Sequence, residues 1–136
     1  MTAVLVDSNV LLDVLTDDQC WAGWSAEALA RAGNSARLVI NPIVYGEVSI
    51  RFTSIEALEA ALPREILEKE AIPFEAAFLA GKAFARYRSA GGSKSSPLPD
   101  FLIGAHAAVA GYDVLTRDSR RFLSYFPKLR LISPTT

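Results

Sequence analysis

The sequence has little of several residue types on which common sites depend. Its 136 residues include one cysteine, Cys20, and one histidine, His106. A lone cysteine cannot form an internal disulfide, and one His and one Cys far apart do not make a zinc site. No apolar run approaches the length that spans a bilayer. The N-terminus also lacks the basic region and cleavage site of a secretion signal. We therefore expect a cytoplasmic protein without a membrane segment.

An overall excess of charge is also missing, because 14 Lys/Arg and 15 Asp/Glu leave a net charge of −1. This balance argues against indiscriminate binding of nucleic acid. The charges are unevenly placed, however. Residues 1–75 hold 5 Lys/Arg and 12 Asp/Glu (−7), whereas residues 76–136 hold 9 Lys/Arg and 3 Asp (+6). This asymmetry is consistent with a polyanionic partner, and nearly as well with charged helix faces in water.

What the sequence does contain is an alternation of short apolar segments with amphipathic ones. The apolar segments predict strands at residues 3–6, 37–40, 67–72, 114–116 and 129–132. The amphipathic segments predict helices at residues 8–15, 21–32, 42–52, 54–62, 74–90, 100–110 and 119–125. Strands separated by helices indicate a parallel sheet covered on both faces. We therefore expect an α/β fold, a single-domain α/β/α sandwich with a mostly parallel central sheet, over residues 1–136.

Four acidic residues fall near the carboxyl ends of these strands or at loop exits, where parallel sheets form their sites. Asp7 and Asp118 follow strands, Asp100 opens a helix, and Glu47 lies in an apolar helix after the second strand. Each also has a structural explanation, as a helix cap or a solvent-facing residue. If the four converge, a divalent cation relieves their repulsion, and all-oxygen ligation suits Mg²⁺ or Mn²⁺.

Four motifs resemble those of the PIN domain family, in the same order and over essentially the whole chain. They are VDSNVLLD (residues 6–13), INPIVYGEV (40–48), DFLIGAHA (100–107) and VLTRDSRRF (114–122). The compact size further resembles the VapC-type toxins of toxin–antitoxin pairs. In those toxins, Ala and Leu often stand where this chain has Gly46 and Val48.

The resemblance implies a PIN-like sandwich and a Mg²⁺- or Mn²⁺-dependent endoribonuclease that hydrolyses RNA phosphodiesters. It also implies the toxin of a type II toxin–antitoxin system, a homodimer and a cognate antitoxin protein. By position, the catalytic and metal-binding acids correspond to Asp7, Glu47, Asp100 and Asp118.

Several further residues are candidates for supporting roles. Ser8, Asn9 and Thr116 are expected to orient the acids or water, or to serve only in turns and caps. Basic residues of the second half are expected to contact the RNA backbone, namely Arg86, Lys94, Arg117 and Arg120. His106 is expected to be a hydrogen-bonded core residue, and Asp13 a surface or cap residue. The glycine- and serine-rich segment 91–99 reads as a surface loop.

Three other functions compete with this interpretation. A phosphatase with an aspartyl nucleophile would have Asp at position 9, where this chain has Asn9. A receiver domain would have a lysine after the last strand, where Ser133 and Pro134 follow Ile132. The third alternative is a catalytically inactive PIN-like module that binds RNA or protein, and the presence of all four acids argues against it.

Overall fold

The computed structural model describes residues 2–63, 65–92 and 98–134. The elements, in chain order, are β1 (Ala3–Val6), α1 (Ser8–Leu15), α2 (Ala22–Ser35), β2 (Arg37–Ile40), α3 (Pro42–Ser49), α4 (Ile55–Ala61), β3 (Leu67–Lys69), α5 (Phe74–Ser89), α6 (Leu98–Ala110), β4 (Asp113–Leu115), α7 (Arg120–Leu123) and β5 (Leu131–Ile132). The strands form one sheet in the order β3-β2-β1-β4-β5, and every strand pair in it is parallel. The predicted α/β fold with a parallel sheet is therefore confirmed. Among the described residues, none of the helices is long and apolar enough to cross a membrane.

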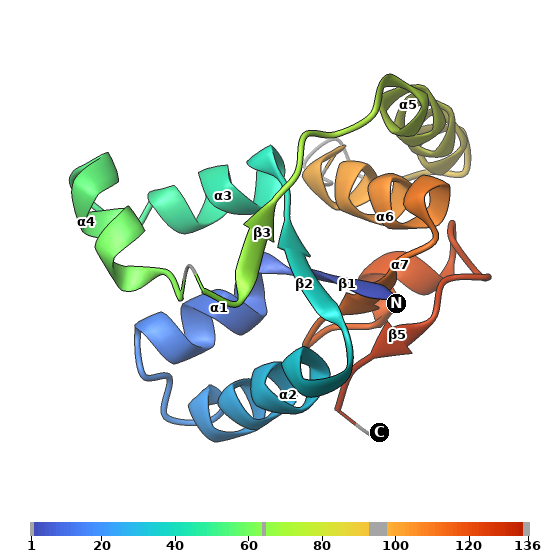
Figure 1. Cartoon of the computed structure of the whole chain (residues 1–136). Coiled ribbons are helices and arrows are strands. Elements are labelled where there is room, and N and C mark those ends of the chain that lie inside the picture. The colour runs from blue at the N-terminus through green and yellow to red at the C-terminus, as the bar shows by residue number, and fades with distance from the viewer. Residues whose placement is uncertain (1, 64, 93–97, 135–136) are drawn as a thin grey trace.

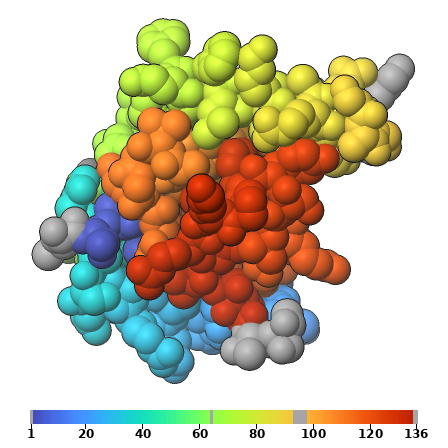
Figure 2. Space-filling view, turned by 90° about the vertical axis from the view of Figure 1, so that its right-hand side faces the viewer, coloured from blue at the N-terminus to red at the C-terminus, as the bar shows by residue number. Residues whose placement is uncertain are grey.

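Helices cover both faces of this sheet (Figure 1). The α1–α2 pair lies on one side, where α2 contacts β2, and α6 lies on the other, in contact with β1 and β4. Helix α5 packs on the outer side of α6. Figure 2 shows the segment after β4, in red, in the middle of one face of the molecule, with residues of α5 above it and of α2 below.

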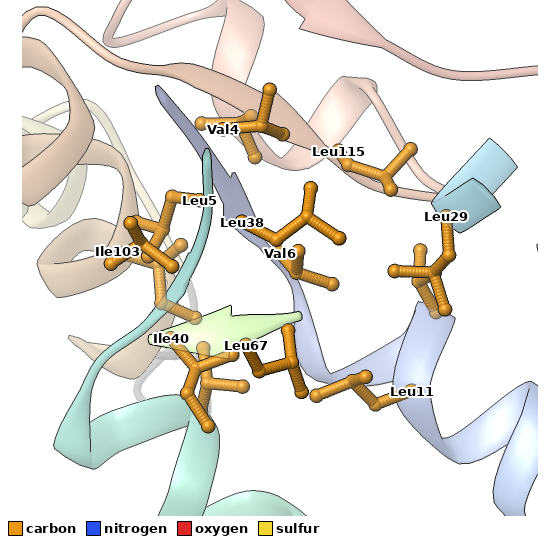
Figure 3. Close-up of a cluster of buried hydrophobic side chains, with 14 of the residues drawn as sticks. Val4, Leu5, Val6, Leu11, Leu29, Leu38, Ile40, Leu67, Ile103 and Leu115 are labelled. Atoms are coloured by element: carbon orange, nitrogen blue, oxygen red, sulfur yellow. The ribbon is translucent and has the colours of Figure 1, made fainter. Parts of the chain in front are cut away.

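The core follows from the alternation of side chains along the strands. Leu5 of β1 lies beside Ile103 of α6, whereas Val6 lies on the side of the sheet that faces Leu11 and Leu29 (Figure 3). All five side chains are buried. Because both faces of β1 are covered, the strand has to be apolar at every position, as its sequence Ala-Val-Leu-Val is.

Several element boundaries differ from the sequence prediction, among them the ends of α2 and β3. Helix α2 continues to Ser35, although Gly33 and Asn34 predicted its end. A Cβ on Gly33 would lie 3.4 Å from Leu38 Cδ1, an ordinary van der Waals contact, so Gly33 sits inside the helix where α2 packs against β2. Strand β3 ends at Lys69 because it pairs only with Leu38–Ile40 of the short strand β2.

The start of α6 also differs from the sequence prediction. The helix begins at Leu98, two residues before the predicted start at Asp100. Pro99 therefore lies in the first turn, where a proline loses no helical hydrogen bond. Asp100 is consequently the third residue of the helix, at its electropositive end.

Candidate active site

Asp7 is held at the carboxyl end of β1 by three hydrogen bonds. Its backbone N–H donates to the Leu115 carbonyl of β4 at 2.8 Å, which continues the pairing of the two central strands. Its side chain caps α1, because Oδ1 accepts from the Ser8 N–H at 2.7 Å. Oδ2 accepts from the Thr116 hydroxyl at 2.8 Å. Both carboxylate oxygens are therefore fixed, and the residue is fully buried.

Glu47 reaches the same region from α3. That helix begins after Asn41, whose side chain accepts from the Val44 N–H at 3.0 Å, and Pro42 is its first residue. Glu47 Oε1 accepts a hydrogen bond from the Ser8 hydroxyl at 2.7 Å. Ser8 thus joins two of the predicted acids, since its N–H holds Asp7 and its hydroxyl holds Glu47.

Asp100 is joined to Asp7 by Arg121 of α7. The Arg121 guanidinium donates from Nε to Asp100 Oδ2 at 3.0 Å and from Nη2 to Asp100 Oδ1. Its third nitrogen, Nη1, donates to Asp7 Oδ2 at 3.0 Å. Asp7 and Asp100 are both buried, so the arginine forms a bridge between two buried carboxylates.

The charges of Asp7, Glu47 and Asp100 act on one another. Burial raises the pKa of Asp7; Arg121 and Thr116 oppose the rise, and Asp100 adds to it. Burial also raises the pKa of Glu47. The hydrogen bond from Ser8 lowers that pKa, whereas the negative charges of Asp7 and Asp100 raise it further. Burial disfavours the charged form of Arg121, but its hydrogen bonds and these three carboxylates outweigh that effect and raise the pKa of the guanidinium. The site therefore favours cations.

Asp118 lies outside this cluster of three. Its side chain is 38% exposed, and Oδ1 accepts from Arg120 N–H at 3.3 Å and Arg120 Nε at 3.4 Å. Its backbone N–H donates to Thr116 Oγ1 at 3.1 Å, and the Asn9 amide also approaches that oxygen at 3.5 Å. The structure therefore brings together Asp7, Glu47 and Asp100, and places Asp118 at the rim of the site.

The predicted RNA-contacting cations occupy different environments. The Arg117 guanidinium donates twice to Asp13, at 2.9 and 3.0 Å, and lies 5.3 Å from the ring of Trp21. Arg120 and Arg86 are exposed. Lys94 and most of the predicted 91–99 loop lie outside the described residues.

Sequence reasoning missed the roles of Arg121 and Asp13. Arg121 was visible only as one of three arginines around Asp118, and no local pattern links it to Asp7 or Asp100. Asp13 is buried, not on the surface, and accepts from the Ser25 hydroxyl at 2.7 Å as well as from Arg117. The only signal was the position of Asp13 six residues after Asp7, on a helix whose buried residues include the apolar Val10 and Leu11.

A second polar network is centred on His106 of α6. His106 is fully buried, as predicted, with Nδ1 3.1 Å from Asn41 Nδ2 and Nε2 2.8 Å from Glu70 Oε2. The Asn41 oxygen caps α3, so its amide nitrogen donates to His106 Nδ1, and Nε2 carries the proton donated to Glu70. Tyr112 also donates to Glu70, at 2.7 Å. The network ties α3, which carries Glu47, to α6.

The donor set fits a hard divalent cation in its chemistry. Asp7, Glu47 and Asp100 offer only carboxylate oxygens, which Mg²⁺ and Mn²⁺ prefer. Among the described residues, however, no three His, Cys, Asp or Glu side chains are placed to hold a metal in this conformation. In this conformation the guanidinium of Arg121 bridges Asp7 and Asp100 and contacts oxygens that would face a shared metal.

Comparison with known proteins identifies one matching family model and a group of solved structures with a similar fold. The sequence matches the family model of the PIN domain over residues 4–126, and no curated protein sequence matches it. The structure is similar to VapBC2 from Rickettsia felis bound to a promoter DNA fragment, at 16% identity and a TM-score of 0.74, covering 97% of this chain and 98% of that one. It is also similar to VapBC-1 from nontypeable Haemophilus influenzae, at 16% identity and a TM-score of 0.73, with the same coverage. A third similar structure is Mycobacterium tuberculosis VapC20, described as a sarcin–ricin loop cleaving toxin, at 16% identity and a TM-score of 0.64, covering 93% and 98%.

Proposed function

Because the chain belongs to the PIN domain family, we propose that it is a metal-dependent endoribonuclease and the toxin of a toxin–antitoxin pair. The observation that carries this proposal is the meeting of Asp7, Glu47 and Asp100, which come from three separate segments of the chain. Burying like charges is costly, and a fold retains them where they serve binding or catalysis. The similar structures support the choice, since VapC20 is described as a sarcin–ricin loop cleaving toxin and the others are VapBC structures.

In this proposal, Asp7 and Asp100 would be the primary ligands of Mg²⁺ or Mn²⁺, and Glu47 and Asp118 would assist directly or through water. The bound cation would supply Lewis-acid polarisation of the scissile phosphate. Water attacks the phosphorus, the bond to the 3′-oxygen breaks, and that oxygen takes a proton. The products then carry a 5′-phosphate and a 3′-hydroxyl.

The chain's own polar residues hold the acids in place for this reaction. Thr116 and the Ser8 N–H fix the two oxygens of Asp7, and the Ser8 hydroxyl fixes Glu47. Asn9 holds the turn that follows β4, because its Oδ1 accepts a hydrogen bond from the Arg117 N–H at 3.2 Å. Such supporting contacts preserve ligand geometry.

The test is cleavage of total RNA, tRNA and rRNA by purified protein with Mg²⁺, Mn²⁺ or EDTA. We expect metal-dependent fragments, and a loss of at least about 100-fold in Asp100→Asn. Asp113→Asn is the matched control, because Asp113 is a partly exposed aspartate that pairs with Arg130 at 4.0 Å. Equal cleavage by wild type and Asp100→Asn would refute the assignment, provided that both proteins show the same circular dichroism.

A second candidate function is a PIN-like module that binds RNA or protein without cutting it. One observation favours it, namely that Arg121 already neutralises part of the charge on Asp7 and Asp100. Binding of tRNA or rRNA that persists in EDTA, with no cleavage in either metal, would favour the module over the nuclease.

The proposed partners are a second copy of the chain and a cognate antitoxin. We expect a homodimer in solution, measured by light scattering, and a stable complex when a neighbouring antitoxin gene is co-expressed. A monomer at micromolar concentration would refute the dimer while leaving the nuclease proposal to the RNA assay.

A further inference from the structure

Arg121 uses all three guanidinium nitrogens on the two carboxylates that are proposed as primary metal ligands. Two nitrogens contact Asp100 and the third contacts Asp7. Arginine forms such forked contacts with more directional specificity than lysine. The positive charge at the centre of the metal-free site is therefore a side chain of the protein.

The arginine and a metal shared by both aspartates would compete for the same space between the two carboxylates. Mg²⁺ binds oxygen at about 2.0–2.1 Å, so an ion held by both aspartates must lie between their carboxylates. That is where the guanidinium lies, with nitrogens 3.0 Å from Asp7 Oδ2 and 3.0 Å from Asp100 Oδ2. The Asp7 oxygens also accept from Ser8 and Thr116, which leaves little freedom to rotate that carboxylate away.

We propose that Arg121 is the built-in counter-cation of the metal-free site, and that a divalent cation enters only by displacing it from Asp7 and Asp100. The inference depends on the proposed metal-dependent function and specifies how loading of that site is controlled. Arg121 holds the acids together without metal and lowers the apparent affinity for metal.

The fold allows this displacement without unfolding. The Arg121 side chain is 26% exposed, so it has a path to water, whereas the adjacent Phe122 is fully buried and anchors α7. The proposed movement is therefore a rotation of the Arg121 side chain, with α7 staying in place. The neighbouring Arg120 is already largely exposed, so the rim has room for an extended arginine.

The competition has a measurable size. When the binding-competent form is only a fraction of the population, the apparent dissociation constant rises by the inverse of that fraction. The arginine makes several charge-assisted hydrogen bonds, and the strength of a single such bond corresponds to a factor of at least about ten. We therefore expect Arg121→Met to bind Mn²⁺ at least about tenfold more tightly than wild type.

The experiment measures Mn²⁺ binding by calorimetry and thermal unfolding with EDTA or saturating Mn²⁺. Arg121→Met should bind Mn²⁺ more tightly than wild type and should unfold at a lower temperature in EDTA. Saturating Mn²⁺ should raise its unfolding temperature by more than it raises that of wild type. Arg31→Met is the control, because it removes the same charge from an exposed arginine paired only with exposed Glu27. It should bind Mn²⁺ as wild type does.

Equal or weaker Mn²⁺ binding by Arg121→Met would overturn the inference and leave the metal site itself intact. No Mn²⁺ binding by either protein would overturn both the inference and the metal-dependent function. If the variant does not fold, an NMR measurement on the wild-type protein tests the proposal instead. The Arg121 Nε–H signal should be protected from solvent exchange in EDTA and lose protection with Mg²⁺, and protection that persists at saturation would overturn the proposal.

Discussion

Replacing Arg117 with methionine should destabilise the protein more than neutralising its partner Asp13 does. The two residues join α1 to the loop after β4, through hydrogen bonds of 2.9 and 3.0 Å. Their exposures differ, since the Asp13 side chain is 3% exposed and that of Arg117 is 32% exposed. Removing the arginine leaves a buried carboxylate whose remaining side-chain partner, among the residues that the structure describes, is Ser25. Asp13→Asn instead leaves an arginine that can reach water.

The magnitudes follow from this asymmetry. Removing one partner of a buried ion pair costs about 3 kcal/mol, which we expect for Arg117→Met. Asp13→Asn keeps a hydrogen-bonding group and should cost about 1.5 kcal/mol. In the double variant neither charge is stranded, so its cost should be about 2 kcal/mol less than the sum of the single costs.

The assay is equilibrium unfolding in urea for the wild type, both single variants and the double variant. The control cycle uses Arg31 and Glu27, whose side chains are 79% and 72% exposed and whose coupling should not exceed about 0.5 kcal/mol. A coupling for Arg117 and Asp13 no larger than that of the control would refute the reasoning. Arg117 would then be free for the predicted contact with RNA.

Three further outcomes are expected. Gly104→Ala should lower the free energy of unfolding in urea by about 1–3 kcal/mol, because a Cβ there would lie 2.7 Å from the Phe126 ring and 3.2 Å from Phe122. The control Gly81→Ala has open space around its Cβ and should raise that free energy by up to about 1 kcal/mol. His106→Leu should cost about 2–3 kcal/mol in thermal unfolding, because it leaves the Asn41 amide and Glu70 without this partner, and a loss no larger than that of Tyr112→Phe would count against the network. In EDTA, the contribution of Asp7 to the free energy of unfolding should fall as pH rises from about 4 through its raised pKa, because the folded state holds the proton more tightly than the unfolded chain does. The free energy of unfolding of wild type, measured relative to Asp7→Asn across this pH range, should therefore decrease.

Most of the fold could be predicted because its signals are local. Strands β1 and β2 have the predicted bounds, since each is a short apolar run closed by a polar cap residue, Asp7 or Asn41. Helix ends were less predictable where tertiary packing decided them. Gly33 ends many helices, but here it packs beside Leu38 and α2 continues to Ser35.

The convergence of Asp7, Glu47 and Asp100 could be inferred because each lies near a strand end or a loop exit, and parallel strands bring their carboxyl ends to one edge. The contacts that organise the site could not be inferred in the same way. Ser8 is one residue from Asp7 but 39 residues from Glu47, which it also holds. Side-chain partners at such separations depend on rotamers and packing that have no periodic trace in a sequence.

The opposite charges of the two halves of the sequence partly reflect ion pairs within the fold. Two cations of the basic half pair with buried acids of the acidic half across more than 100 residues, Arg117 with Asp13 and Arg121 with Asp7. These cations therefore do not count toward a surface for RNA in the described conformation. The exposed Arg86 and Arg120 remain available for that role. Displacement of Arg121 by a metal would return one more cation to the rim, next to Arg120, so metal loading and the positive charge offered to a phosphate backbone would rise together.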